Sequence, residues 1–392
     1  MNTMDGLVLV RGGTVFAPEP LGRQDLLLAG GRIVAMGTRI APRGIDVTTI
    51  DATNYTVVPG FIDLHVHLIG GGGEAGPASR LAELPLSELV AAGTTTAVGV
   101  LGTDRVTRSP ATLLAKVKAL RAAGLGAYMY TGSYHLPSIT ICGSVERDLA
   151  LIDAVVGVKL AISDHRGSQV TVDELARIAA EARVGGMLGG KPGIVHLHVG
   201  RGAAGLGPVF EVVERTDIPI TQFLPTHMTQ PPALLQDGIT FVKRGGAIDL
   251  TARPEHGGNG EMAEAVGRLV ESGIDLQRIT LSSDGNGSMP RFDAAGALIG
   301  MAAGKVGALY DTFANLVRHK VLSLSDALAL VTANPAARLG LSMERGNLRP
   351  RAHADVVLLD GDLAIDTVLC NGVAAVRNGK LARDLSTAGD PG

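Results

Sequence analysis

The strongest constraint on how this chain folds is an alternation that runs from about residue 58 to residue 344. Short apolar runs rich in β-branched residues are each followed by a stretch with the apolar spacing of a helix. We predict strands at residues 61–66, 94–100, 126–130, 155–162, 194–199, 218–224, 247–250 and 279–282. Helices are predicted between them, for example at residues 110–123, 172–184 and 259–272. About eight such units over this length are typical of a (β/α)8 TIM barrel, an α/β fold.

An open, doubly wound sheet is the alternative architecture. It would predict a glycine-rich phosphate-binding turn directly after the first strand. Residues 70–73 are all glycine, but they follow two histidines and lack both a GxGxxG register and a Lys-Ser/Thr pair. The barrel is therefore the preferred interpretation, and no nucleotide site is predicted.

The two ends of the chain have a different pattern, made of short strands and tight turns. Gly30-Gly31 lies between two apolar runs near the start, and Asn371-Gly372 and Asn378-Gly379 are strong hairpin dipeptides near the end. Neither end holds enough strands to bury a face, so we expect the two ends to pair. The predicted organisation is a small β-sandwich domain from residues 1–57 and 345–392 beside a barrel at residues 58–344.

The composition excludes several classes of function. The chain has 35 basic and 38 acidic residues, interspersed, with 3% aromatic residues and no Trp, which argues against a nucleic-acid partner. No apolar stretch reaches the roughly 18 residues of a membrane helix, and the start does not resemble a signal peptide. Only Cys142 and Cys370 are present. We therefore expect a cytoplasmic protein that acts on a small molecule and contacts no membrane.

Histidines and one aspartate lie at the ends of different predicted strands. His65 and His67 close the first strand, and residues two apart in a strand share a face. The carboxyl ends of barrel strands carry the catalytic groups of such enzymes. His196 and His198 form a second pair, in which position favours His198 as a metal ligand and His196 as a strand or supporting histidine. The candidate metal ligands at strand ends are therefore His65, His67, His198, His227 and Asp284.

Lys159 lies inside the apolar run at residues 155–162. A lysine in a buried strand is costly unless it is paired or neutral, and a salt-bridged lysine is the structural alternative. Burial lowers the pKa of the amine, and a neutral amine can add carbon dioxide to form an anionic carbamate. Two divalent cations about 3.6 Å apart repel by roughly 18 kcal/mol at an effective dielectric of about 20, so anionic ligands are needed. Imidazole and oxygen ligands suit zinc, without excluding cobalt, nickel or manganese.

These residues give the chain a resemblance to a known family. Residues 59–67, PGFIDLHVH, resemble the opening metal motif of the amidohydrolase superfamily. A closer resemblance, over nearly the whole chain, is to the isoaspartyl (β-aspartyl) dipeptidases. It rests on residues 70–76 (GGGGEAG), 101–104 (LGTD), 163–166 (SDHR), 189–193 (GGKPG) and 281–288 (LSSDGNGS).

The resemblance implies a barrel with a small β-sandwich and a centre of two Zn²⁺ per subunit. His65 and His67 would hold one cation together with Asp284, and His198 and His227 would hold the other. The carboxylated lysine and a hydroxide would bridge the pair. Asp284 would take a proton from the bridging water and deliver it to the leaving amine. The family also implies a homo-oligomer.

The resemblance further implies how a β-aspartyl substrate is held. Glu74 looks like the residue that pairs with the free α-ammonium of the substrate. Gly72, Thr103 and Ser288 match positions that hold its α-carboxylate or amine. A solvated loop charge is the structural alternative for Glu74.

Two further residues match substrate contacts of the family. Tyr134 matches a phenol that polarises the scissile carbonyl, a position from which it would stabilise the oxyanion. Arg166 matches an arginine that binds a substrate carboxylate. The structural alternatives are a core aromatic for Tyr134 and an ion pair with Asp164 for Arg166.

One departure from the family pattern affects the expected specificity. The family has a second carboxylate-binding arginine three residues after the histidine that ends the sixth strand, and here that position is Gln230. An amide cannot replace the bidentate, charged contact of a guanidinium. Either another cation substitutes, for which Arg253 is the candidate, or the preferred substrate differs.

The sequence thus predicts a dinuclear zinc hydrolase that cleaves β-aspartyl dipeptides. A hydrolase of a cyclic amide or an N-acyl amino acid is the alternative, and it would not need Glu74 to meet an ammonium group. A non-catalytic scaffold on the same fold is a third hypothesis, which the complete set of candidate ligands disfavours.

Overall fold

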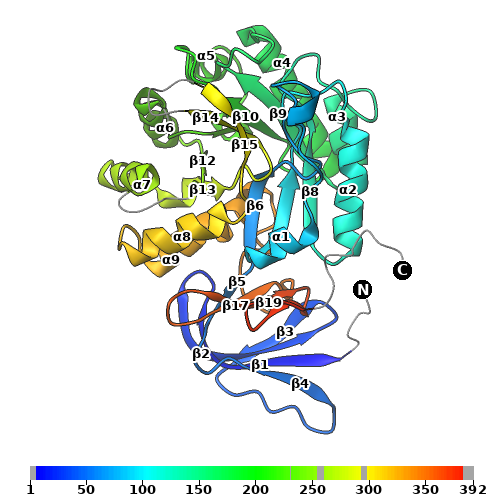
Figure 1. Cartoon of the computed structure of the whole chain (residues 1–392), viewed down its shortest axis with the longest axis vertical. Coiled ribbons are helices and arrows are strands. Elements are labelled where there is room, and N and C mark those ends of the chain that lie inside the picture. The colour runs from blue at the N-terminus through cyan, green and yellow to red at the C-terminus, as the bar shows by residue number, and fades with distance from the viewer. Residues whose placement is uncertain (1–5, 230, 254–259, 293–297, 383–392) are drawn as a thin grey trace.

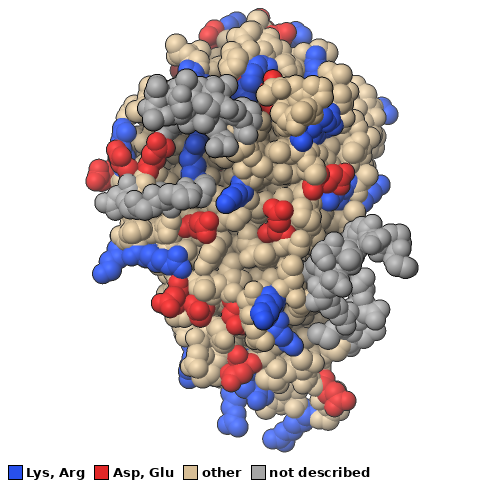
Figure 2. Space-filling view, in the orientation of Figure 1, with Lys and Arg blue, Asp and Glu red and all other residues tan. Residues whose placement is uncertain are grey.

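The structure, a computed structural model, describes residues 6–229, 231–253, 260–292 and 298–382. Figure 1 shows two parts along the long axis, with strands surrounded by helices in one and a curved sheet in the other. Within the described residues, no helix is both long and apolar enough to cross a bilayer. Basic and acidic side chains are interspersed on the face shown in Figure 2.

The first part is a barrel of parallel strands. The strands are β6 (Phe61–Val66), β7 (Thr94–Gly99), β8 (Gly126–Gly132), β9 (Val155–Ile162), β10 (Ile194–Val199), β11 (Phe223–Thr226), β12 (Ile248–Thr251) and β13 (Ile279–Ser282). Strands β6 to β11 form one hydrogen-bonded sheet, and β12 pairs with β13. All residues of β6, β7, β9 and β10 are buried, as expected for parallel strands covered on both faces.

Side chains and loops bridge the two seams between these sheets. At the β13–β6 seam, the His67 amide donates to the carbonyl of Gly285 at 2.9 Å. At the β11–β12 seam, the Thr226 hydroxyl donates to Asp249 at 2.6 Å. The strands therefore close into the (β/α)8 barrel that the sequence predicts.

Helices follow the strands and cover the outside of the barrel (Figure 1). They are α1 (Leu86–Ala91), α2 (Pro110–Ala122), α3 (Val145–Leu151), α4 (Val172–Gly189), α5 (Gly207–Arg215), α6 (Pro232–Lys243) and α7 (Glu261–Glu271). The hairpin of β14 (Ser288–Phe292) and β15 (Leu298–Ala303) comes after β13, followed by α8 (Ala308–Arg318), α9 (Leu324–Val331) and α10 (Ala333–Arg338). Short 3-10 turns lie at Pro77–Ser79, Ile220–Gln222 and Leu276–Arg278.

Several predicted boundaries differ from the observed ones for local reasons. The strand predicted at residues 218–224 begins only at Phe223, because Pro219, which lacks an amide hydrogen, precedes a 3-10 turn. Helix α4 continues past the predicted end at residue 184 and stops before Gly190, which has φ 63°. The predicted start of a helix at Asn259 lies outside the described residues.

The second part is a nine-stranded sheet built from both ends of the chain. Its strands are β1 (Leu7–Phe16), β2 (Pro20–Ala29), β3 (Arg32–Gly37), β4 (Val47–Asp51), β5 (Thr56–Pro59), β16 (Val356–Leu359), β17 (Ile365–Cys370), β18 (Val373–Arg377) and β19 (Lys380–Leu381). Strand β5 pairs with β16 in antiparallel register, which joins the two ends. Positive φ angles at Asn371 and Gly372 allow the tight hairpin between β17 and β18. The predicted pairing of the two chain ends is confirmed, while the domain boundaries at 57/58 and 344/345 stay predictions.

A buried ion pair links the two parts. Arg345 donates to the carboxylate of Asp355, and both side chains are less than a tenth exposed. Arg345 also donates to the hydroxyl of Thr96 on β7, at 3.3 Å. The other Asp355 oxygen accepts from the amide of Asn371, at 2.9 Å. Asn371 in turn donates to the carbonyl of Gly124, which lies just before β8, at 2.7 Å.

Replacing Arg345 with methionine is expected to destabilise the protein by about 3–5 kcal/mol, because it leaves the buried Asp355 carboxylate without its cation. The check is the thermal unfolding midpoint of Arg345→Met against that of Arg11→Met, which removes an exposed arginine on β1. Equal midpoints for the two variants would show that the pair does not hold the parts together.

Candidate metal centre

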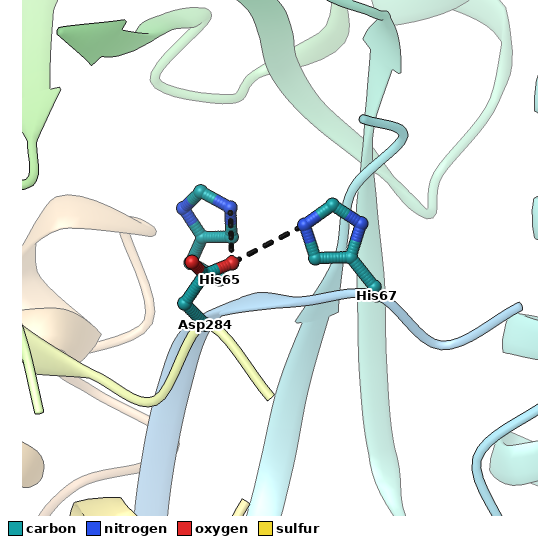
Figure 3. Close-up of side chains that lie close together, drawn as sticks. All are labelled: His65, His67 and Asp284. Carbon is teal, nitrogen blue, oxygen red and sulfur yellow. Dashed lines mark ion pairs between the residues drawn. The ribbon is translucent and has the colours of Figure 1, made fainter. Parts of the chain in front are cut away.

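Three side chains converge at the carboxyl ends of β6 and β13 (Figure 3). His65 is fully buried in β6, and His67 follows directly after the strand. The Asp284 Oδ1 atom lies 3.4 Å from Nε2 of His65 and 3.2 Å from Nε2 of His67. All three candidate ligand atoms lie within 4.8 Å of one another. The arrangement is that of one cation site with two imidazole nitrogens and one carboxylate oxygen.

The backbone around this cluster leaves no room for additional side chains. Asp284 itself has φ 50°, a left-handed conformation that turns its carboxylate toward the histidines. A Cβ on Gly287 would lie 2.5 Å from Oδ1 of Asp284, and one on Gly102 would lie 3.0 Å from Cε1 of His67. The glycines of both segments are therefore required by close approach to the site.

Lys159 lies within β9 beside this cluster and is fully buried. Its Nζ atom is 3.4 Å from both ring nitrogens of His65. Burial lowers the pKa of Lys159 to about 7, although the charges of Asp284 and Asp249 oppose the shift. An amine with such a pKa is substantially neutral at physiological pH, which is the form that can react with carbon dioxide.

His198 and His227 form the second half of the site. Their ring centroids are 4.5 Å apart, and the His227 ring lies 5.3 Å from that of His65. His227 has φ 67° and directly follows β11, and its Nδ1 lies 2.5 Å from the hydroxyl of Thr251. The structure thus brings His65, His67, Lys159, His198, His227 and Asp284 together at one end of the barrel.

Hydrogen bonds define which nitrogen of His198 is available to a cation. Its Nε2 lies 2.7 Å from Oδ2 of Asp164, and its Nδ1 lies 2.8 Å from the hydroxyl of Tyr134. An ionised carboxylate only accepts, so Nε2 donates to Asp164 and Nδ1 carries the lone pair. A cation would therefore bind Nδ1, with Asp164 fixing the ring from the other side, as carboxylates do for metal-bound histidines.

The electrostatics of the site favour neutral imidazoles and an ionised carboxylate. Burial holds the pKa of His65 and of His227 well below the ordinary value and lowers that of His198 to about 4. Burial alone would raise the pKa of Asp284, but the hydrogen bond to His67 and the nearby imidazoles outweigh it and bring the pKa to about 2. Neutral imidazole and ionised carboxylate are the forms that ligate zinc, so this donor set fits metal cations.

His196 lies below the candidate ligands rather than among them. Its Nε2 atom is 3.0 Å from Nδ1 of His65, and its ring stacks on that of Tyr130 with centroids 4.7 Å apart. A cation on Nε2 of His65 would require Nδ1 of the same ring to donate to His196. The position fits the supporting role that the sequence suggested.

The predicted substrate residues lie around the same opening. The Glu74 carboxylate is 3.9 Å from Nη1 of Arg166, and Arg166 also makes two hydrogen bonds to Asp164, of 3.1 and 2.8 Å. The Arg166 guanidinium lies over the ring of Tyr134, 5.5 Å from its centroid. The ion pair with Asp164, named above as the structural alternative for Arg166, is present. It leaves Nη1 facing Glu74.

The remaining predicted substrate contacts are Gly72, Thr103 and Ser288. Gly72 has φ 78°, and a Cβ there would lie 2.1 Å from the carbonyl oxygen of Ser79. Thr103 is half-buried in the loop after β7, and Ser288 begins β14. The Ser288 amide nitrogen lies 3.3 Å from where a Cβ on Gly71 would be, so this segment adjoins the glycine loop. The substrate roles of Gly72, Thr103 and Ser288 stay predictions.

Of the two residues expected to affect binding of the terminal carboxylate, the structure describes Arg253 but not Gln230. Gln230 lies outside the described residues. Arg253 follows β12, and its Nε atom is buried without a hydrogen-bond partner among the residues described. Its charge is one of several influences, after burial, that lower the pKa of His227, so it lies within electrostatic range of the site. Arg253 is thus a cation near the site, and its contact with a substrate anion stays a prediction.

Sequence reasoning missed two carboxylates under the site. Asp63 is fully buried and accepts from the amides of His65 and Ser283, at 3.2 and 3.1 Å. Asp249 is also buried. It accepts hydroxyl hydrogens from Thr226, Thr280 and Ser282 at 2.5–2.6 Å. The spacing 63, 65, 67 carries the signal for Asp63, since alternate residues of a strand share a face.

Comparisons with known proteins agree with this geometry. The amidohydrolase family pattern matches residues 56–380. A crystal structure of a β-aspartyl dipeptidase from Fervidobacterium islandicum AW-1, in complex with β-Asp-Leu, is 39% identical. The alignment covers 97% of this chain and 99% of that one, with a TM-score of 0.91.

More distant relatives have other names. A dihydroorotase from Pelotomaculum thermopropionicum is 24% identical over 91% of this chain and 90% of its own length. An adenine deaminase from Ruegeria pomeroyi is 23% identical over 96% of this chain, which spans 58% of that protein. The pattern match over most of the chain and the 39% identity establish the relationship. The chain therefore belongs to the amidohydrolase family, in the group of the β-aspartyl dipeptidases, and is a metal-dependent hydrolase.

Proposed function

We propose that this hydrolase cleaves β-aspartyl (isoaspartyl) dipeptides at a centre that holds two zinc ions. The observation that carries the proposal is the placement of the Glu74–Arg166 pair beside the cluster of four imidazoles, Lys159 and Asp284. A β-aspartyl residue presents a free α-ammonium and a free α-carboxylate on one carbon. A site for it needs an anion and a cation side by side, and Glu74 and Arg166 lie 3.9 Å apart.

The donor set divides into two groups that would each hold one cation. His65 and His67 with Asp284 form one group, and His198 and His227 form the other. A carbamate on Lys159 would supply an anionic ligand between them. When bound, the cations supply positive charge that acidifies a water molecule and polarises the scissile carbonyl.

The protein's own groups would move the protons of the hydrolysis. The water oxygen bonds to the carbonyl carbon, the carbon–nitrogen bond breaks, and aspartate and a free amino acid leave. Asp284 has a pKa of about 2 and is ionised at neutral pH, so it can accept the water proton. It then delivers that proton to the leaving nitrogen, in the role of general base and acid.

Tyr134 is suited to stabilise the charge that develops on the carbonyl oxygen. Burial raises the pKa of this phenol well above its ordinary value, so the hydroxyl remains a hydrogen-bond donor. In the structure it donates to the same His198 nitrogen that a cation would occupy. Binding of a cation there would release the hydroxyl toward the substrate, where it would act as an oxyanion donor.

We propose Arg253 as the group that binds the terminal carboxylate in place of the family arginine that Gln230 replaces. A homo-oligomer and a cytoplasmic location are proposals that rest on the resemblance and on the two cysteines.

Hydrolysis of a cyclic amide or an N-acyl amino acid is the second candidate function. The similarity to a dihydroorotase over most of both chains favours it. The two functions differ in whether Glu74 must meet a substrate ammonium group, and this difference decides between them. A scaffold without activity stays the least supported hypothesis, because such a protein would not need the complete set of candidate metal ligands.

The purified enzyme is expected to hydrolyse β-Asp-Leu and to leave α-Asp-Leu intact, because only the β-linked form presents its ammonium and carboxylate together. A chelator should abolish the activity, and added zinc should restore it. Release of leucine measures the rate.

N-acetylation of the substrate separates the candidate functions. Acetyl-β-Asp-Leu should be inert if Glu74 binds the ammonium group. Equal or faster cleavage of the acetylated peptide would favour the N-acyl amino acid hydrolase. No hydrolysis of any of these compounds by protein that contains no tightly bound metal would favour the scaffold.

Lys159→Ala is expected to lower the rate by more than about 100-fold, the upper end of the usual loss for groups that support a metal site. Acetate or propionate should restore part of the activity, because a small carboxylate can occupy the place of the carbamate. The matched control is Lys191→Ala, which removes a half-buried lysine that donates to the carbonyl of Ile152. Full activity of Lys159→Ala without added acid would contradict the bridging role.

Arg253→Ala is expected to raise KM for β-Asp-Leu roughly tenfold, the effect of losing one hydrogen bond to a charged group. KM for β-Asp-leucinamide, which has no terminal carboxylate, should change little. Arg11→Ala, which removes an exposed arginine on β1 in the other part of the fold, is the control. An unchanged KM for β-Asp-Leu would remove Arg253 as the substitute for the family arginine.

A further inference from the structure

Arg108 is a buried arginine that belongs to none of the groups described above. It lies two residues before α2, and its side chain is 5% exposed. Its guanidinium donates to four backbone carbonyls, those of Ile69, Gly71, Gly72 and Leu81, over distances of 2.9–3.3 Å. It also donates to the carboxylate of Asp104, at 3.1 Å. Every nitrogen of the fork thus has a partner.

Three of the carbonyls that Arg108 binds, those of Ile69, Gly71 and Gly72, belong to the glycine-rich loop that ends at Glu74. This loop, residues 69–74, contains four consecutive glycines and has few side chains with which to hold itself. Gly70 and Gly72 have φ of 80° and 78°, and a Cβ on Gly70 would lie 2.2 Å from the carbonyl oxygen of Leu81. Such a loop is entropically costly to order, so its conformation depends on contacts from outside it.

The opposite side of the loop is attached to the segment that carries Asp284. The Gly71 amide donates to the carbonyl of Asn286 at 2.9 Å. The Asn286 side chain donates to the carbonyl of Ala82 at 2.8 Å. The loop is therefore held between Arg108 on one side and the metal-site segment on the other. A shift of Arg108 would move Gly72, whose carbonyl it binds, and with it Glu74, two residues further along the loop.

We propose that Arg108 is a positioning residue that sets the place of Gly72 and Glu74 and thereby the affinity for the substrate's ammonium group. The inference rests on the proposed function, in which Glu74 binds the ammonium group of the substrate. A lysine cannot take over the role, because an ammonium group lacks the planar fork that reaches four carbonyls at once. Asp104 balances the charge of the buried guanidinium, which keeps the arrangement electrostatically tolerable.

The test compares Arg108→Lys and Arg108→Met with Arg80→Met. Arg80 is the matched control, because it also pairs with Asp104, at 2.9 Å, but its side chain is 38% exposed. Each methionine variant removes one of the two cations that pair with Asp104, while the fork on the loop is lost only at position 108. For each variant, KM and kcat for β-Asp-Leu, metal content and hydrogen exchange of the amides of residues 69–74 are measured.

We expect both Arg108 variants to raise KM roughly tenfold or more, with a smaller change in kcat and with unchanged metal content. Amide exchange in residues 69–74 should become faster in the Arg108 variants and remain at the wild-type rate in Arg80→Met. Arg108→Lys keeps the charge and most of the volume, so it provides the result if Arg108→Met does not fold.

Two outcomes would overturn the proposal. Unchanged exchange of the loop in Arg108→Lys would show that the fork does not hold it, and faster exchange with an unchanged KM would show that its position does not govern affinity. An equal rise of KM in Arg80→Met would assign the effect to Asp104 instead. Failure of the proposed function is recognised separately, because the wild-type enzyme would then not cleave β-Asp-Leu, whereas the exchange measurement needs no substrate.

Discussion

Desolvation at the mouth of the barrel is the condition on which the chemistry of this protein depends. Water would stabilise the protonated forms of the imidazoles and of Lys159, and protonated groups do not bind cations. Burial removes that stabilisation, so the pKa of Lys159 is about 7 and that of His198 about 4. Asp284 remains ionised in the same surroundings because the hydrogen bond to His67 and the nearby imidazoles lower its pKa. The buried placement of these side chains therefore gives them the protonation states that bind cations.

The same burial makes ionised carboxylates inside the barrel energetically unfavourable. Asp63 and Asp249 lie beneath the site, and burial raises their pKa values to about 7 and about 6. Hydroxyls from β11 and β13 donate to Asp249, and the amide of Ser283 donates to Asp63. The bond from Thr226 crosses the β11–β12 seam, and the bond from Ser283 crosses the β13–β6 seam, where the strands lack a continuous ladder. Side-chain hydrogen bonds thus add to the backbone contact between His67 and Gly285 where the parallel sheet is interrupted.

Local patterns in the sequence predicted much of this arrangement. The alternation of apolar runs with helical stretches identified the barrel strands, and the position of histidines at strand ends identified the candidate ligands. Contacts between distant loops carry no such local signal. The bond from His198 to Asp164, and those from Arg108 to the glycine loop, depend on how loops meet in space. The strand predicted from residue 218 begins only at Phe223, because the first part of this apolar run forms a 3-10 turn after Pro219.

The connection between the two parts of the fold has a consequence for the order of assembly. Gly60 alone separates β5 from β6, the strand that holds His65, and β5 is completed by β16 near the other end of the chain. During synthesis the strand that holds His65 therefore emerges well before β16, and the edge of β5 beside it stays open until β16 has been made. An unpaired edge of this kind can pair with other chains, so the nascent protein is exposed to aggregation until β16 covers β5.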